Sequence, residues 1–226
     1  MSNYLNIFIF CFTFLSITFW VQITLFLSSL GSFKNPQTTL YNQKLLSLVL
    51  SKTGYQLDKI FLVNSKKLFG MMPSFIKPHL ILSQELYTNF DDDETEYVLL
   101  HEMAHFLLHH VFKEELLGIF LLIAGITITI ALNFTLLSSI LLGFIFGVTM
   151  IRFGRLHEYE ADDYSLSRMT NPSGMITATK KFQAQYGSPR NKLLEALFYR
   201  GNLFGNRIKM AETEISKRQL THKTIP

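Results

Sequence analysis

Residues Leu116 to Ile151 form a stretch of 36 residues without a single charged side chain. As one straight helix this stretch would be about 54 Å long, well beyond the roughly 30 Å of a bilayer's hydrocarbon core. Asn133, near its middle, indicates a turn between two short apolar helices. We therefore predict a membrane hairpin over residues 116–151, which either crosses the bilayer or enters it deeply. A hairpin returns the residues after Arg152 to the side of the membrane from which the chain entered.

A second apolar run, from Leu5 to Leu30, also carries no charge. Its length suits a helix that spans a bilayer with some tilt. A cleaved signal peptide would begin with basic residues, and Met1-Ser2-Asn3-Tyr4 contains none. Residues 1–31 are therefore predicted to be an uncleaved transmembrane anchor. A hydrophobic content of 48%, with 21 Phe, agrees with a membrane protein.

Composition excludes several classes of protein. The only cysteine, Cys11, allows neither an internal disulfide nor a cysteine-rich zinc site. The net charge of +4 is modest, and the basic residues are scattered without interleaved aromatic side chains. That pattern does not support nucleic-acid binding. The sequence gives no indication of the oligomeric state.

The polar parts of the chain predict a small sheet beside helices. Leucines and a valine over residues 40–50 favour a packed helix that ends near Gly54. Apolar runs at 60–63 and 79–83 predict two short strands, separated by a loop around Gly70. The edge of such a sheet either holds an extended peptide by strand addition or only supports the next helix. The sequence allows both interpretations.

An acidic run, Asp91-Asp92-Asp93-Glu94, precedes the longest polar helix that the sequence predicts. Acidic side chains at a helix start cap free N–H groups and meet the positive end of the helix dipole. A calcium loop would instead need spaced oxygen ligands and a glycine, which this run lacks. We favour the helix start, and we expect the helix to continue to about Lys113.

The predicted helix contains the pentapeptide His101-Glu102-Met103-Ala104-His105, which has the form H-E-x-x-H. A helix places the two imidazoles one turn apart on the same face, where they can share a divalent metal such as Zn²⁺. Glu102, next to the first ligand, can act as general base towards a water that the metal activates. The motif predicts metal-assisted hydrolysis of a peptide bond. The alternative is an amphipathic helix with ordinary polar histidines.

A zinc ion with two His ligands needs a third protein ligand, often a Glu from a later helix, with water in the fourth position. The segment that returns from the hairpin supplies candidates in Glu158-Tyr159-Glu160-Ala161-Asp162. Glu158 and Asp162 share one helix face, so one can bind the metal while the other accepts the free N–H of a ligand histidine. A structural zinc would close its fourth position with protein, so three visible ligands favour a catalytic site.

These motifs resemble the HtpX-type membrane zinc metallopeptidases, gluzincins whose family also contains the CAAX prenyl proteases. The matching features are H-E-M-A-H with a further histidine at position 110, the membrane hairpin, and E-Y-E-A-D, which fits the family pattern E-x-x-A-D. The resemblance covers roughly residues 40 to 165. It implies one zinc per chain held by His101, His105 and Glu158, with Glu102 as base and Asp162 orienting a ligand. Glu160 is the alternative third ligand, and the family pattern favours Glu158.

The sequence departs from that family at both ends. It has one N-terminal apolar span where HtpX-type proteins generally have two, and it lacks their usual His-Pro segment near the C-terminus. The tail Gly205-Asn206-Arg207-Ile208, together with Phe69-Gly70 and Lys77-Pro78, is similar to sensor metallopeptidases of the BlaR/MecR type. Those sensors cleave a specific regulatory protein, so the substrate class stays open between the two groups.

Two further residues are candidates for stabilising the oxyanion of the transition state. His157 precedes Glu158, and the alternative for it is a polar residue at the membrane boundary. Arg207 could reach the site if the tail helix folds back; the alternative is an ordinary charged helix residue. Residues after about Lys217 are expected to fray.

The expected fold is a mainly α membrane protein with a small β-sheet. A zincin-like metallopeptidase domain over residues 32–226 would be interrupted by the hairpin at 116–151. All 21 Lys and Arg lie outside the two apolar stretches, so the positive-inside rule places those polar regions in the cytoplasm. We expect a metalloendopeptidase of a prokaryotic cytoplasmic membrane that cleaves membrane-proximal proteins or peptides, for instance in protein quality control. A sensor peptidase with one partner and a non-catalytic membrane scaffold are the alternatives.

Overall fold

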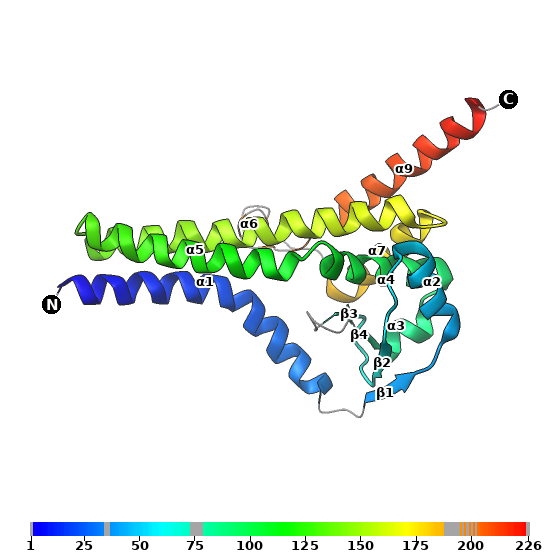
Figure 1. Cartoon of the computed structure of the whole chain (residues 1–226), viewed down its shortest axis with the longest axis horizontal. Coiled ribbons are helices and arrows are strands. Elements are labelled where there is room, and N and C mark those ends of the chain that lie inside the picture. The colour runs from blue at the N-terminus through cyan, green and yellow to red at the C-terminus, as the bar shows by residue number, and fades with distance from the viewer. Residues whose placement is uncertain are drawn as a thin grey trace. The chain divides into compact units, whose positions relative to one another are not determined.

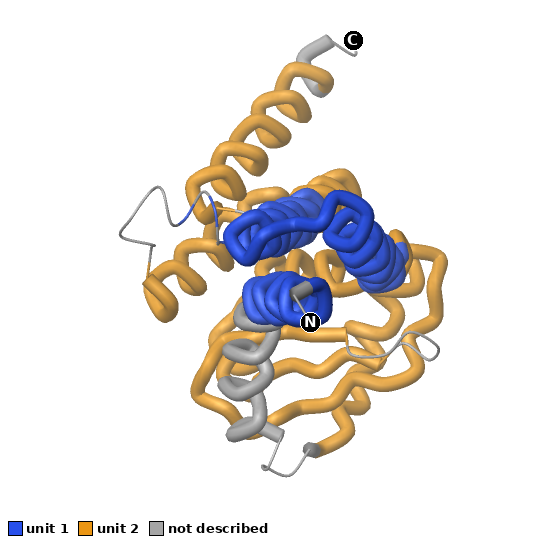
Figure 2. Tube along the Cα trace, turned by 90° about the vertical axis from the view of Figure 1, so that its left-hand side faces the viewer, with its two compact units in different colours: residues 1–30, 109–156, 190–201 blue, residues 31–108, 157–189, 202–226 orange. Residues whose placement is uncertain are grey.

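The protein is described by a computed structural model that covers residues 2–33, 37–72, 79–187 and 203–224, with positions 195, 197, 199 and 201. Side chains within it are described for residues 3–18, 38–72, 79–187 and 203–221 and for those four positions. The chain forms two compact units (Figure 2). Residues 1–30, 109–156 and 190–201 make a helical unit, and residues 31–108, 157–189 and 202–226 make a mixed unit that contains the sheet.

The helical unit contains α1 (Ser2–Phe33), α5 (His110–Ala131) and the first part of α6 (Leu136–Arg168), as Figure 1 shows. Helices α5 and α6 follow one another across a short turn, as predicted, and both are long and apolar enough to cross a membrane. The turn lies where the sequence indicated, because Asn133 adopts a left-handed conformation with φ 47° between the two helices. The expected N-terminal helix is also present as α1, and its described apolar part is Asn3–Thr18.

Glycines in the hairpin allow α1 to pack closely against it. Beside Gly143, an added Cβ would lie 2.9 Å from the backbone oxygen of Phe10, and beside Gly125 it would overlap the Phe10 ring. Ile17 occupies the corresponding space at Gly147. Small residues let membrane helices approach in this way, and the contact area is gained through dispersion forces. Phe10 is consequently fully buried in the helical unit.

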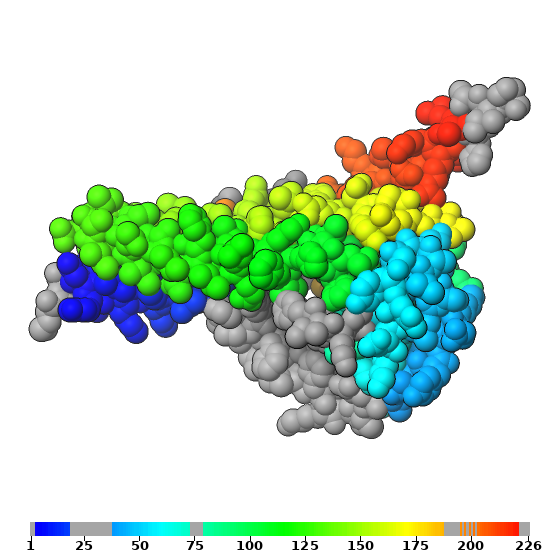
Figure 3. Space-filling view, in the orientation of Figure 1, coloured from blue at the N-terminus to red at the C-terminus, as the bar shows by residue number. Residues whose placement is uncertain are grey.

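Helix α5, green in Figure 3, exposes many apolar side chains. Exposed side chains of this kind cost little in lipid but would be a large unfavourable patch in water. This surface agrees with the predicted membrane hairpin. The exposed apolar side chains on α5 include Phe112, Leu116, Ile119, Phe120, Ile123 and Ile130.

The mixed unit is built on a four-stranded sheet with the order β1-β2-β4-β3. The strands are β1 (Gln37–Leu40), β2 (Lys59–Val63), β3 (Gly70–Met71) and β4 (His79–Ser83). Strands β2 and β4 are parallel and confirm the two predicted strands, whereas β1 and β3 are antiparallel to their neighbours. Leu40 was predicted to be helical and lies in β1, and β3 forms in the expected loop. Both strands are short, so they form only because a neighbouring strand pairs with them.

Helix α2 (Gln43–Thr53) ends at Gly54, whose φ of 71° is left-handed, as the sequence predicted. Helix α4 (Asp92–Leu107) begins at Asp91 with a capping box to Glu94, so the acidic run is confirmed as a helix start. The helix does not continue to Lys113. His109 adopts a left-handed conformation with φ 56°, which breaks the helical path and separates α4 from α5.

The interior of the mixed unit lies between the sheet and the helices that pack around it. Residues 94–101 of α4 are all buried, and α4 packs against α7 (Ser173–Tyr186), which in turn packs against α9 (Phe204–Thr224). The short helix α3 (Gln84–Asn89) follows β4. The expectation of a frayed tail after Lys217 is wrong, because α9 is helical to Thr224. Arg218 fastens it by donating to the backbone oxygens of Leu166 and Met169 at the end of α6.

Candidate metal centre

Helix α4 places both histidines of the H-E-x-x-H motif with their ring nitrogens facing one point. The Nε2 atoms of His101 and His105 lie 3.2 Å apart. His101 is 8% exposed, since its position on the helix faces the interior of the mixed unit. The two imidazoles come from adjacent turns, so the helix itself fixes their separation.

The last part of α6 brings a carboxylate to the same point. Glu158 lies with Oε2 at 3.5 Å from Nε2 of His101 and with Oε1 at 3.5 Å from Nε2 of His105. The three ligand atoms lie within 4.8 Å of one another, and among the described residues this is the group with metal-ligand spacing. Glu160, the alternative third ligand, is exposed and lies outside the group.

The distances between these atoms suit zinc. Ligand atoms about 2.0–2.1 Å from a tetrahedral zinc are separated from one another by about 3.3 Å. The observed separations of 3.2 and 3.5 Å come close to that value. The donor set of two imidazoles and one carboxylate is also the type found in catalytic zinc sites.

Asp162 lies behind His101 and is completely buried. Its Oδ1 lies 2.9 Å from Nδ1 of His101, so that nitrogen can carry the proton and leave Nε2 with its lone pair towards the metal position. The same oxygen accepts a hydrogen bond of 2.8 Å from the hydroxyl of Tyr97. The sequence interpretation missed Tyr97, although its position one turn before His101 places it on the same helix face.

Arg207 reaches the site from α9. Its Nε donates to Oδ2 of Asp162 at 2.8 Å, and Nη2 donates to Oε2 of Glu158 at 3.1 Å. His157 is 2% exposed and lies next to Glu158 on α6, so the two side chains leave the helix about 100° apart. His157 is not part of the described metal-spaced group. A role of either residue in stabilising an oxyanion stays a prediction.

The charges of this cluster shift the pKa values of its members strongly. Burial alone would lower the pKa of His101, but the Asp162 and Glu158 carboxylates raise it well above its usual range. Burial alone would raise the pKa values of the two carboxyls, but His101 and Arg207 hold both well below their usual range. Without metal, the two carboxylates therefore favour a protonated His101. A metal ion at this position would have to displace that proton.

Glu102 faces the edge of the sheet. Burial raises its pKa to about 7, assisted by the Glu158 charge and opposed by His101, Arg207 and a hydrogen bond from the backbone N–H of Met72. Strand β3 comes this close because it has glycine at position 70. A Cβ there would lie 2.8 Å from Cγ1 of Val98 and 3.4 Å from Cγ of Glu102.

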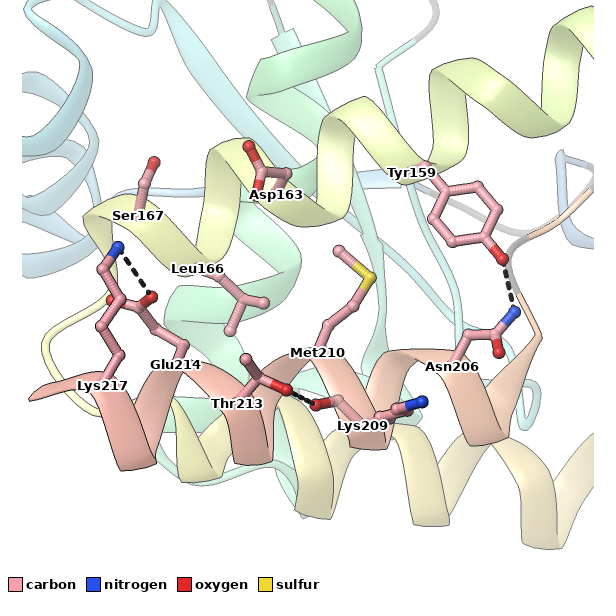
Figure 4. Close-up of a pocket in the computed structure, with 10 residues that line it drawn as sticks. All are labelled: Tyr159, Asp163, Leu166, Ser167, Asn206, Lys209, Met210, Thr213, Glu214 and Lys217. Carbon is pink, nitrogen blue, oxygen red and sulfur yellow. Dashed lines mark hydrogen bonds and ion pairs between the residues drawn. The ribbon is translucent and has the colours of Figure 1, made fainter.

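A groove with a volume of about 670 Å³ lies between the last part of α6 and α9 (Figure 4). At one end Asn206 donates a hydrogen bond to the hydroxyl of Tyr159. The groove is separate from the candidate metal site, because its lining includes none of the site side chains His101, Glu102, His105, Glu158, Asp162 and Arg207. Its lining is mixed in charge: Tyr159, Asp163, Leu166, Ser167, Asn206, Lys209, Met210, Thr213, Glu214 and Lys217.

Comparisons with known proteins identify the family and the fold. A protein-family model described as Peptidase family M48 matches residues 36–215. The crystal structure of S. mikatae Ste24p superposes with a TM-score of 0.60 at 18% sequence identity, over 92% of this chain and 57% of that chain. At that identity the likeness shows the fold, and this chain spans 57% of the Ste24p length. No curated protein matches the chain. The findings confirm the resemblance to the HtpX-type and CAAX-protease-type family and the predicted fold class.

Proposed function

The chain belongs to Peptidase family M48, and from this premise we propose that it is a membrane-integrated, zinc-dependent metalloendopeptidase. It would hydrolyse peptide bonds of membrane or membrane-proximal proteins. The observation that carries the proposal is the convergence of His101, His105 and Glu158 within 4.8 Å, at separations that fit a tetrahedral zinc. Residues 1–31 would anchor the chain, and the hairpin would hold the catalytic domain at the membrane.

His101, His105 and Glu158 would hold one zinc ion. When bound, zinc supplies Lewis-acid chemistry, polarising the scissile carbonyl and acidifying the attacking water. Asp162 would fix the tautomer of His101 through Nδ1, which keeps Nε2 available to the metal. Arg207 would balance the charges of Asp162 and Glu158, since it binds a carboxylate oxygen of each.

Glu102 would act as the general base. It would take the proton of the attacking water at its carboxylate and later deliver that proton to the nitrogen of the leaving amine. Its raised pKa of about 7 supports both proton transfers, because a carboxyl group with a pKa near neutral pH can both accept and release a proton. The N–H of Met72 would orient the carboxylate during both transfers.

Strand β3 would hold the substrate as an extra strand. It is the last described strand in the sheet order, and Gly70 brings its backbone against the helix that carries Glu102. A peptide that pairs with such an edge gains backbone hydrogen bonds whatever its side chains are. This mode of binding suits an endopeptidase with broad substrates, including damaged membrane proteins in quality control.

The site would face the cytoplasm of a prokaryotic cell, in its cytoplasmic membrane. This part of the proposal rests on the distribution of Lys and Arg, none of which lies before the first apolar run or between Lys113 and Arg152.

A BlaR/MecR-like sensor peptidase with one protein partner is the second candidate. Two of the three segments that resemble those sensors lie at the site, because Gly70 lies beside Glu102 and Arg207 binds Asp162. The third, Lys77-Pro78, lies outside the described residues. Such a sensor would cleave a specific regulatory protein and would have low activity on generic substrates.

The test compares wild type with Glu102→Gln, both purified in detergent and loaded with zinc, on an unfolded protein substrate. Zinc content is measured in both, and loss of the base is expected to lower the rate by about 10²- to 10⁴-fold. Cleavage by wild type alone, with zinc retained in both, supports the endopeptidase. Bound zinc without cleavage favours the sensor, and a wild type that takes up no zinc refutes the enzyme and leaves the membrane scaffold.

A further inference from the structure

Tyr97 is a buried tyrosine that contacts two members of the site without being a ligand in the proposed zinc site. It lies on α4 one turn before His101 and is 2% exposed. Its hydroxyl donates to Oδ1 of Asp162 at 2.8 Å. Its ring is tilted against the imidazole of His101, with 5.8 Å between the ring centroids.

Asp162 comes from α6, and its carboxylate is held from two sides. On one side Arg207, from α9, binds Oδ2. On the other side two groups from α4 share Oδ1, namely the Tyr97 hydroxyl at 2.8 Å and Nδ1 of His101 at 2.9 Å. A carboxylate bound by only one of the α4 groups can rotate towards Arg207. Two attachment points one turn apart on the same helix oppose that rotation.

We propose that Tyr97 is a positioning residue for the metal centre: its hydroxyl fixes the Asp162 carboxylate so that His101 presents Nε2 to the zinc ion. The proposal rests on the function proposed above. It adds a residue that neither the H-E-x-x-H motif nor the E-x-x-A-D pattern includes.

The Tyr97 hydroxyl has two opposite effects on the hydrogen bond between His101 and Asp162. As a second donor to Oδ1 it competes with His101 for the negative charge, and this effect alone would weaken the His101–Asp162 bond. As an attachment point it holds the carboxylate where that bond forms, and this effect strengthens it. Positioning predicts that zinc leaves faster when the hydroxyl is removed, whereas competition predicts slower release.

The experiment uses the full-length protein in detergent, loaded with zinc, and measures zinc release to a colorimetric chelator. Tyr97→Phe removes the hydroxyl and keeps the ring against His101. Tyr186→Phe is the matched control, because that hydroxyl also donates a hydrogen bond, but to the backbone oxygen of Leu68 rather than to Asp162. We expect Tyr97→Phe to release zinc about 10-fold faster, which is the lower bound of the effect typical of residues that hydrogen-bond to metal ligands. Tyr186→Phe should match wild type.

A second readout separates positioning from general destabilisation. The rise in Tm that zinc produces is measured for each protein against its metal-free form. A purely structural loss lowers both Tm values equally, whereas loss of positioning shrinks the zinc-induced rise in Tyr97→Phe only.

The outcomes distinguish failure of the role of Tyr97 from failure of the proposed function. Faster release with a smaller zinc-induced rise supports the inference. Release at or below the wild-type rate overturns it and leaves the proposed function intact. A wild-type protein that binds no zinc overturns the proposed function, and the inference with it.

Discussion

Arg207→Met is the substitution that most directly tests how the site is held together. The side chain of Arg207 is 12% exposed and binds both Asp162, which is fully buried, and Glu158, which is 22% exposed. Methionine keeps much of the length and the apolar stem but removes the positive charge and both hydrogen bonds. In the metal-free protein, the imidazoles of His101 and His105 are then the described side chains in contact with these carboxylates that can carry positive charge.

The magnitude follows from the two contacts. Two unit charges 4 Å apart attract by about 4 kcal/mol at an effective dielectric constant near 20. Removing one partner of a buried pair costs about 3–5 kcal/mol, because the other charge stays buried and uncompensated. We expect the metal-free variant to lose about 4 kcal/mol of unfolding free energy, or about 10 °C in Tm for a chain of this size. Zinc beside Glu158 supplies positive charge, so the zinc-loaded variant should lose about half as much.

The assay is thermal unfolding in detergent, with and without zinc, beside Arg218→Met as the matched control. Arg218 lies on the same helix and donates to backbone oxygens at the end of α6, and it is not one of the residues that contact His101, His105 or Glu158. Arg218→Met should cost less than Arg207→Met and should respond equally with and without zinc.

The dependence on pH gives a further check. Asp162 and Glu158 have pKa values lowered in the folded protein, so they add stability above their ordinary pKa near 4 and lose it as the pH falls. The difference between wild type and Arg207→Met should be full above about pH 5 and shrink below it. A metal-free Arg207→Met that is no less stable than Arg218→Met at pH 7 would show that the carboxylates do not depend on this arginine.

Two other predictions concern the proposed base Glu102 and the helical unit. Glu102 must be deprotonated to act as a base, and burial raises its pKa to about 7. The value of kcat/KM should therefore fall as the pH decreases. The fall should begin at or below pH 7, because the positive charge of a bound zinc ion would lower the pKa of Glu102. A rate that increases towards pH 5 in a pH profile would contradict this assignment. In the helical unit, Gly143→Ala should lower the free energy of unfolding by about 1–3 kcal/mol, measured by thermal unfolding. Its Cβ would lie 2.9 Å from the Phe10 backbone oxygen and 3.1 Å from the Phe14 backbone nitrogen, and backbone atoms cannot move aside as a side chain can. Gly118→Ala, which meets only one side-chain atom at 3.6 Å, is the control, and equal losses would argue against close packing of α1.

Local patterns determined much of the protein. The 36 uncharged residues require a hairpin for reasons of length, and Asn133 forms its turn. The acidic run predicts the start of α4 because its capping box involves only neighbours in sequence. The spacing of His101 and His105 likewise follows from helix geometry alone. Each of these features depends on residues within a few turns of one another.

Pairing between distant segments decided the rest. Strands β1 and β3 have too few residues to carry a pattern, and they exist because β2 and β4 offer free edges. The helix breaks at His109, but no glycine or proline lies beside that residue, so the sequence did not predict the break.

The site shows the same division. Sequence spacing named His101, Glu102, His105, Glu158 and Asp162 as candidates, and their roles stay proposals. Only the fold brings Arg207 from α9, and the hydroxyl of Tyr97, onto Asp162. Which charges neutralise a buried carboxylate depends on how helices far apart in sequence pack, so no local pattern in the chain could specify it.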